Sequence, residues 1–164
     1  MGGVHTVPMR IMLKLVLDCP PDAAWRAIRS PAVFREVSAP FTTFTSLEPG
    51  GFPEVWPAGE HPVQARAFGV VPLGEQLIEI SFGRRGDARL VHDTGGGLSG
   101  AMTAIDYWHH TMAISPAAGG KTLYRDRLVF DAAPFSLLAW PALWVFWQWR
   151  ALQIRRLSKH WTAA

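Results

Sequence analysis

Alternating polar and apolar residues between Ala101 and Asp131 predict two long strands that fold back on each other. Successive side chains of a strand point to opposite faces, so residues two apart share a face. Single polar groups on an apolar face occur in ligand pockets, and they also occur in cores where each polar group is hydrogen-bonded. The face that we expect to point inward is apolar apart from Asp106, His110, Tyr124 and Asp126.

The segments around this hairpin predict a strand, two short helices, a meander of strands and a long final helix, in that order. Apolar residues alternate with other residues over 11–17, which predicts the first strand. Prolines at first-turn positions, Pro21 and Pro31, predict the starts of the two helices. Gly- and Pro-rich turns recur about every dozen residues after Phe41, as in an antiparallel sheet. Residues 134–164 have helical periodicity, and we expect Pro141 to kink or restart this helix.

Composition narrows the class of protein. The chain has 164 residues, of which 49% are apolar and 18% charged, so we predict one domain over residues 1–164. The net charge is only +3 and no nucleic-acid-binding motif accompanies it, so we expect no nucleic-acid partner. The single cysteine, Cys19, excludes an internal disulfide, and no apolar run precedes Ile11. We therefore expect a cytoplasmic protein without a secretory signal.

The element order resembles the helix-grip fold of the superfamily of START-related proteins, polyketide cyclases and pollen-allergen-like proteins, often called SRPBCC. Two segments are similar to that superfamily: LVLDCPPDAAWRAIRSPAVF, and the G-x-T-x-Y-x-D segment from Gly120 to Asp126. The resemblance implies an α+β fold in which a bent, seven-stranded antiparallel sheet grips a long C-terminal helix, with two short helices after the first strand. It also implies a cavity for an apolar small molecule between sheet and helix.

His110 and Asp126 are candidates for acid–base chemistry. A carboxylate that accepts from one ring nitrogen would fix the histidine tautomer and leave the other nitrogen free as a base. Tyr124, on the same face, is a candidate hydrogen-bond donor to a substrate. A satisfied core histidine–aspartate bond would produce the same pattern. His109 and His110 point to opposite faces and no cofactor motif is present, so we expect neither a metal site nor a cofactor.

Arg150 lies within an apolar stripe of the final helix that we expect to pack on the sheet. An unpaired buried guanidinium is very costly, so it needs a partner or an exit. Three arrangements remain open: an ion pair with Asp106 or Asp126, an escape of the charged end to the surface, and contact with an anionic ligand.

We expect the protein to bind or transport a hydrophobic small molecule such as a lipid, a polyketide or a terpenoid-like compound. The alternative is an enzyme of the polyketide cyclase or dehydratase type, with His110 as acid or base, Asp126 as its orienter and Tyr124 as a hydrogen-bond donor. The predicted pocket lining is Gln76, Asp106, Trp108, His110, Tyr124, Asp126, Phe146, Trp147 and Arg150.

The final helix has more apolar residues than one core-facing stripe can accommodate. Trp144, Val145, Trp149 and Leu152 point away from that stripe, and such a patch marks a contact surface. Either a homodimer or peripheral contact with an anionic membrane would cover it, the second because basic residues follow along the helix. Pro141 interrupts the apolar run, so we reject a transmembrane helix.

The connection from Pro49 to Pro62 is too long for a tight hairpin turn. It contains Phe52 and Trp56, which are costly to leave in water. Such a loop is either a lid over the mouth of a pocket or a plug in the core.

Overall fold

The computed structural model of the protein describes residues 7–162. Seven antiparallel strands form one sheet in the order β1-β7-β6-β5-β4-β3-β2. The strands are β1 (Met9–Leu17), β2 (Thr42–Ser46), β3 (Gly59–Ala67), β4 (Val71–Arg85), β5 (Ala88–Asp93), β6 (Tyr107–Pro116) and β7 (Thr122–Asp131). The helices are α1 (Pro21–Ile28), α2 (Pro31–Ser38) and α3 (Ser136–Ser158), with the short 3-10 helices η1 (Gly100–Ala104) and η2 (Ala118–Gly120).

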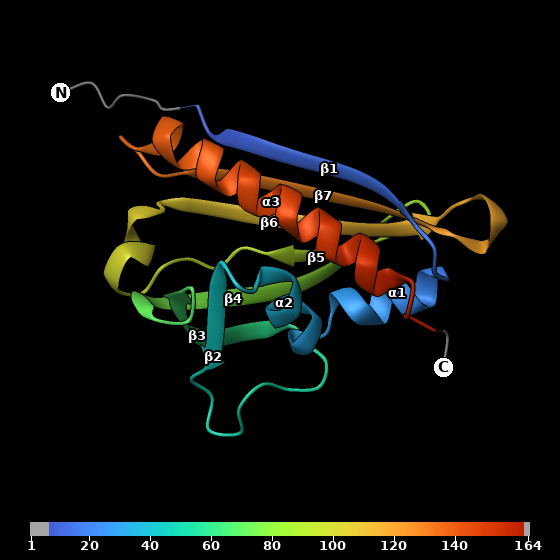
Figure 1. The fold of residues 1–164 in the computed structure, drawn as a ribbon, viewed down its shortest axis with the longest axis horizontal. Coiled ribbons are helices and arrows are strands. Elements are labelled where there is room, and N and C mark those ends of the chain that lie inside the picture. The colour runs from blue at the N-terminus through green and yellow to red at the C-terminus, as the bar shows by residue number, and fades with distance from the viewer. Residues whose placement is uncertain (1–6, 163–164) are drawn as a thin grey trace.

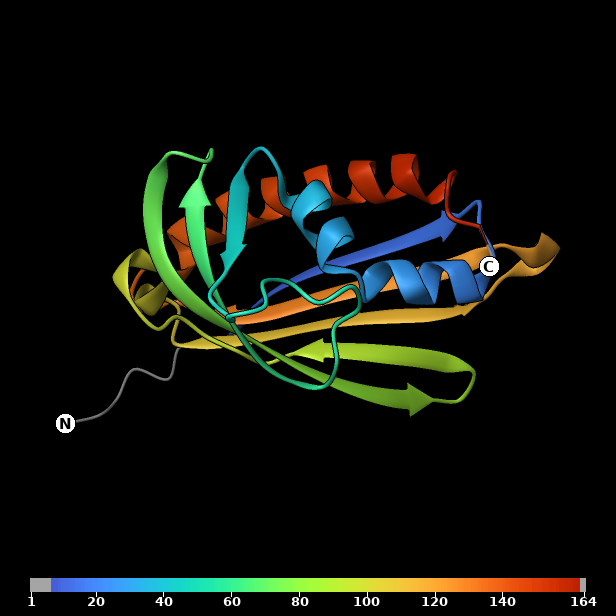
Figure 2. The same cartoon turned by 90° about the horizontal axis from the view of Figure 1, so that it is seen from below.

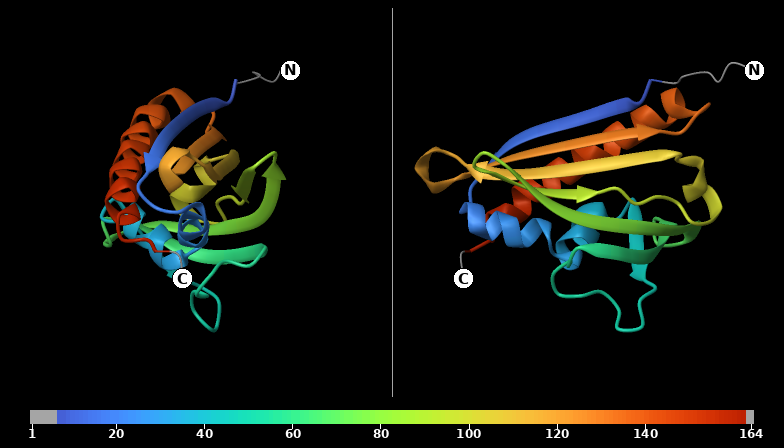
Figure 3. Two further views of the ribbon diagram at one scale, coloured as in Figure 1. Left: turned by 90° about the vertical axis from the view of Figure 1, so that its right-hand side faces the viewer. Right: turned by 180° about the vertical axis from the view of Figure 1, so that it is seen from behind.

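The sheet bends around α3, which lies along its concave side (Figure 1). Helices α1 and α2 occupy the space between α3 and the sheet (Figure 2), and α2 contacts both α3 and β2. Viewed along the long axis, the sheet curls from β1 round to β2 with α3 across the open side (Figure 3). The predicted element order and the α+β helix-grip fold are therefore confirmed.

The second short helix begins as the sequence predicts. Ser30 precedes Pro31, and its Oγ accepts a hydrogen bond from the backbone N–H of Val33 at 3.5 Å. This bond satisfies one of the helix N–H groups that have no partner within the helix. Ser30 is therefore the N-cap of α2.

Strand β7 has the alternation of buried and outward side chains that the sequence predicts. Tyr124, Asp126, Leu128 and Phe130 are each at most 2% exposed. Strands β1 and β6 pair with β7 on either side over residues 122–130, so these side chains have a neighbouring strand on both sides. The polar members of this set are consequently shielded from bulk water.

The first strand of the predicted hairpin is shorter than expected. Strand β6 begins at Tyr107 instead of Ala101, because residues 100–104 form η1. A side chain at Gly97 would bring its Cβ within 2.1 Å of the carbonyl oxygen of Met102, so the backbone is closely packed here. The glycine-rich segment before η1 is thus a packing element, and the chain joins the sheet only after it.

Helix α3 continues through Pro141 instead of restarting there (Figure 1). Proline lacks an N–H, so the carbonyl of Leu137 loses its helical hydrogen bond. Leu137 is 76% exposed, and water can replace that partner. Within the part of the chain that the structure describes, no helix is long and apolar enough to cross a membrane.

The outward side of α3 carries part of the expected apolar patch. Trp144, Val145 and Leu152 are 43%, 50% and 59% exposed. The expectation for Trp149 is wrong, because this side chain is half-buried and its Nε1–H donates a hydrogen bond to the Ala39 carbonyl at 2.7 Å. The α2–β2 connection therefore covers Trp149.

The long loop before β3 plugs the core. Trp56 is only 3% exposed, and its backbone N–H donates to the carbonyl of Arg29 at 2.8 Å. Its ring packs edge-on against Phe34 and Phe52, with ring centroids 6.1 and 5.7 Å apart. The loop is therefore anchored by a buried tryptophan.

Candidate functional site

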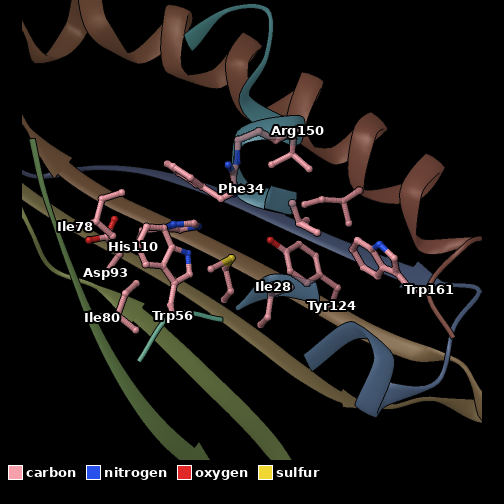
Figure 4. A pocket seen from close by; sticks show the side chains of 14 residues that line it. Ile28, Phe34, Trp56, Ile78, Ile80, Asp93, His110, Tyr124, Arg150 and Trp161 are labelled. Atoms are coloured by element: carbon pink, nitrogen blue, oxygen red, sulfur yellow. The ribbon is translucent and has the colours of Figure 1, made fainter. Parts of the chain in front are cut away.

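Two adjoining cavities lie between α3 and the concave face of the sheet. The outer cavity has a volume of about 320 Å³ and the inner one about 50 Å³. Figure 4 shows the inner cavity, where Arg150 extends from α3 into the space above the sheet, on the side to which His110 and Tyr124 point. The residues common to both linings are Phe34, Ile78, Asp93, His110 and Arg150.

The lining of the outer cavity is mostly apolar. α2 and β2 contribute one wall, β4 and the η1 region a second, and α3 a third. Gln76 belongs to this lining and is 8% exposed, so its amide is one of the few polar groups there. The apolar side chains are Phe41, Phe44, Phe68, Leu73, Met102, Ile105, Trp108, Leu143, Phe146 and Trp147, with Phe34 and Ile78 from the shared set.

Asp126 organises a buried hydrogen-bond network below the cavities. His110 Nε2–H donates to its Oδ1 at 2.8 Å, and Trp147 Nε1–H donates to the same oxygen at 2.9 Å. Tyr124 O–H donates to Oδ2 at 2.5 Å. The carboxylate thus accepts three bonds, from β6, β7 and α3.

The electrostatics of the network keep Asp126 ionised. Burial alone would raise the pKa of Asp126, but the charge and hydrogen bond of His110, with Arg150 and Tyr124, outweigh it and lower the pKa to about 2. Burial and the Asp126 charge raise the pKa of Tyr124 well above its ordinary value, although Arg150 acts in the lowering direction. Tyr124 is therefore a neutral phenol whose single proton is already donated to Asp126.

This bond changes the expected role of Tyr124. In the alternative enzyme function Tyr124 is a candidate donor to a substrate, but a hydroxyl has one proton and Asp126 accepts it. The phenol lines the inner cavity, where it also interacts with the side chain of Arg150.

His110 has one ring nitrogen held and one free of hydrogen bonds to the described chain. Nε2 bonds to Asp126, while Nδ1 has no partner among residues 7–162, and the ring lines both cavities. His109 points to the opposite face, where its Nε2 lies 3.4 Å from His92 Nδ1. A neutral His110 therefore presents a lone pair on Nδ1, the arrangement that a general base requires.

Asp93 is a site residue that the sequence reasoning missed. It lies opposite His110 in the β5–β6 ladder and lines both cavities. Its carboxylate accepts from the backbone N–H groups of Glu79 and Gly95 at 3.1 and 3.2 Å, and from Trp108 Nε1–H at 3.3 Å. Asp93 follows buried Val91 by two residues, so strand alternation was a signal that could have placed it inward.

Burial raises the pKa of Asp93. The charge of His110 and the three N–H donors act in the opposite direction and offset part of this effect. The cavity therefore contains one carboxyl group, Asp93, whose protonation is easier than usual.

Arg150 is buried without an ion pair. It is 5% exposed, so its charged end does not escape to the surface, and no carboxylate among residues 7–162 lies within 4.0 Å of it. Its Nε has no hydrogen-bond partner in the structure. The guanidinium carbon lies 5.2 Å from the centroid of the Trp147 ring and 6.0 Å from that of Phe146. Of the three arrangements left open by the sequence, the direct ion pair with Asp106 or Asp126 is therefore not the one found among the described residues.

The structure brings together most of the predicted lining. The outer cavity combines Gln76, Trp108, His110, Phe146, Trp147 and Arg150, and Tyr124 lines the inner one. Asp126 lies behind this surface, in contact with His110 and Trp147.

The expectation for Asp106 is wrong. Its side chain is exposed, because the residue precedes the first position of β6 and the strand alternation does not extend to it. Among the described residues, no group of three or more His, Cys, Asp or Glu side chains is arranged to hold a metal ion.

No protein-family model matches the chain, and no curated protein matches its sequence. Solved structures do match it. Norcoclaurine synthase from Thalictrum flavum, in complex with dopamine and hydroxybenzaldehyde, is 14% identical, with 98% of this chain and 92% of that chain covered and a TM-score of 0.64. A hypothetical protein from Helicobacter pylori is 11% identical, with 92% and 88% covered and a TM-score of 0.65. A protein from Chromobacterium violaceum is 17% identical, with 92% and 97% covered and a TM-score of 0.59. The chain therefore has the same helix-grip fold as norcoclaurine synthase over nearly its whole length.

Proposed function

We propose that this protein binds a small, largely apolar organic molecule, such as a lipid, polyketide or terpenoid-like compound, in the outer cavity. The observation that carries the proposal is a cavity of about 320 Å³ whose lining is apolar except for a few converging polar groups. Ligand pockets have this composition and volumes of about 300–1,000 Å³. Norcoclaurine synthase, in its complex with dopamine and hydroxybenzaldehyde, is a protein of the same fold that holds small aromatic molecules.

A cavity-filling variant tests the proposal. Leu143 lines the outer cavity, and Leu143→Trp would occupy part of its volume. Leu152→Trp places the same side chain on the outward face of α3, where Leu152 is 59% exposed. We expect wild type and Leu152→Trp to bind the neutral fluorescent probe N-phenyl-1-naphthylamine equally well, and Leu143→Trp to bind it at least about tenfold more weakly. Absence of probe binding by the wild type would contradict the proposal, as would equal binding by Leu143→Trp.

Native mass spectrometry of protein from its own host would identify the natural ligand.

The second candidate function is acid–base catalysis of the cyclase or dehydratase type. The specific observation in its favour is His110, with Nε2 held by Asp126 and Nδ1 unpartnered at the cavity within the described part of the chain. Such a base could remove a proton next to a carbonyl group, because its tautomer and orientation are set in advance.

Deuterium uptake tests this second function without knowledge of the substrate. 2-Decanone in D₂O exchanges the protons next to its carbonyl slowly, and a positioned base should accelerate that exchange. We expect faster uptake with wild type than with His110→Asn, measured by mass spectrometry of the recovered ketone. Equal rates in the two proteins, with the probe still bound by both, would leave binding as the only function.

A further inference from the structure

We propose that the ligand carries a carboxylate, or an equivalent planar anion, and that Arg150 binds this group at the junction of the two cavities. This inference rests on the proposed binding function and adds the chemical class of the ligand. Its starting point is the buried arginine, which has no ion-pair partner within 4.0 Å in residues 7–162.

Arg150 interacts with the neutral phenol of Tyr124, but no carboxylate among the described residues pairs with it, so its charge remains available to an anionic ligand. Isolated buried charges are very unfavourable, so a buried guanidinium is normally paired or hydrogen-bonded. Arg150 is 5% exposed, and its Nε has no hydrogen-bond partner among residues 7–162. The faces of Trp147 and Phe146 lie beside the guanidinium, with ring centroids 5.2 and 6.0 Å away, and aromatic rings can hold a cation in position but cannot accept its N–H groups as a carboxylate does.

The neighbouring carboxylates do not take this role. Asp126 already accepts three hydrogen bonds, from His110, Trp147 and Tyr124, and it affects Arg150 only at a longer distance. Asp93 also accepts three, from two backbone N–H groups and Trp108. Both carboxylates are therefore bound to donors other than arginine.

The shape of the site indicates the orientation of the ligand. Arg150 belongs to both linings, so it lies where the outer cavity meets the inner one. The inner cavity, at about 50 Å³, is small, whereas the outer one is larger and mostly apolar. An acid would therefore place its carboxylate deep at Arg150 and its apolar part in the outer cavity, toward Phe68 and Leu143. A planar carboxylate also matches the fork of N–H donors on a guanidinium.

Three probes with the same ten-carbon chain test the inference: decanoic acid, 1-decanol and decylamine, titrated at pH 8 by displacement of N-phenyl-1-naphthylamine. We expect wild type to bind decanoate at least about tenfold more tightly than 1-decanol, because charged hydrogen bonds are stronger than neutral ones. We expect decylamine to bind most weakly. Arg150→Gln should reduce the preference for decanoate over 1-decanol to less than about threefold, with little change for 1-decanol.

The control variant is Arg156→Gln, which removes the same charge from an exposed position of α3. It should retain the full preference for decanoate. Equal affinities of wild type for the acid and the alcohol would overturn the inference while leaving the binding function intact. A preference for decylamine would overturn it too and would assign the polar contact to Asp93. If none of the probes binds, the binding function itself fails. The comparison of the three probes on wild type stands even if Arg150→Gln does not fold.

Discussion

His110 and Asp126 lie on adjacent strands, and His110 Nε2 is 2.8 Å from Asp126 Oδ1. The same oxygen accepts from Trp147 of α3 at 2.9 Å, so one carboxylate joins the sheet to the helix that it grips. This arrangement places Nδ1 of His110, which has no partner among the described residues, at the cavity. The network therefore contributes both to the stability of the fold and to the geometry of the site.

Replacing Asp126 with Asn should strongly destabilise the protein. The carboxylate accepts hydrogen bonds from His110, Tyr124 and Trp147, and the single oxygen of an amide cannot accept all three. The NH₂ group of the introduced amide would replace one carboxylate oxygen and would then face a hydrogen-bond donor. Removal of one partner from a buried charged network costs about 3–5 kcal/mol. Urea denaturation followed by tryptophan fluorescence would measure the loss. Asp106→Asn, at an exposed site, should stay within about 0.5 kcal/mol of wild type. Equal stabilities of Asp126→Asn and wild type would refute the assigned role.

The stabilisation by Asp126 should decrease in acid. Its pKa is lowered from 3.8 to about 2 in the folded state, so its contribution is present above about pH 4 and is lost as the pH falls through 2. The stability difference between wild type and Asp126→Asn should therefore shrink by about 2 kcal/mol between pH 5 and pH 2. Asp93 has a raised pKa, so its effect has the opposite sign, but it is present in both proteins and cancels in this difference. A difference that does not change with pH would contradict the prediction.

We predict that the neutral ring of His110 carries its proton on Nε2. Because Asp126 is a carboxylate and can only accept, Nε2 must carry the proton of the neutral ring. Long-range proton–nitrogen NMR of the neutral ring should show Nε2 protonated and Nδ1 unprotonated. A proton on Nδ1 would remove the free lone pair and with it the case for a general base.

Substitution by alanine should affect stability very differently at the neighbouring residues Gly96 and Gly97. At Gly97 a Cβ would lie 2.1 Å from the Met102 carbonyl oxygen, whereas at Gly96 nothing lies within 4 Å. Gly97→Ala should cost about 1–3 kcal/mol, since an inserted methyl group must displace backbone. It should also weaken probe binding, because Gly97 pairs with the cavity residue Gln76. Gly96→Ala is the matched control and should leave thermal stability and binding nearly unchanged. Similar melting temperatures for the two variants would show that the contact at Gly97 is not rigid.

The outward face of α3 should bind an anionic lipid surface. Trp144, Val145 and Leu152 are exposed there, and Arg155 and Arg156 follow on the same side of the helix. Apolar side chains next to basic ones are typical of helices that lie at membrane interfaces. We predict that wild type sediments with phosphatidylglycerol vesicles and not with phosphatidylcholine vesicles, and that Trp144→Gln with Leu152→Gln abolishes this binding.

Self-association gives the opposing result for this face. If the protein ignores anionic vesicles but forms a dimer that the same double variant dissociates, the surface is an interface between two copies. Sedimentation velocity would decide between these outcomes. Trp149 is left unchanged in this variant, because Ala39 accepts its indole N–H and its loss would affect folding.

Local periodicity in the sequence was enough to predict several parts of the fold. Strand alternation correctly placed Tyr124 and Asp126 on the buried face of β7, and the Ser30-Pro31 pair correctly started α2. These features were predictable because the two-residue period of a strand and the capping of a helix are properties of a few consecutive residues. The resemblance to the helix-grip superfamily then supplied the way in which the elements pack.

Which polar residues meet in the cavity depends on long-range packing and could not be predicted from the sequence. Asp106 shares the sequence alternation of His110, yet it is exposed, because η1 packs against the sheet and delays the start of β6. Asp93 faces the cavity because β5 pairs with β6 in a register that sets it opposite His110. Arg150 has no ion pair within residues 7–162, because Asp126 is already bound by donors from three elements. Strand ends, registers and the competition among donors for one carboxylate depend on residues far apart in the chain, and no local pattern encodes them.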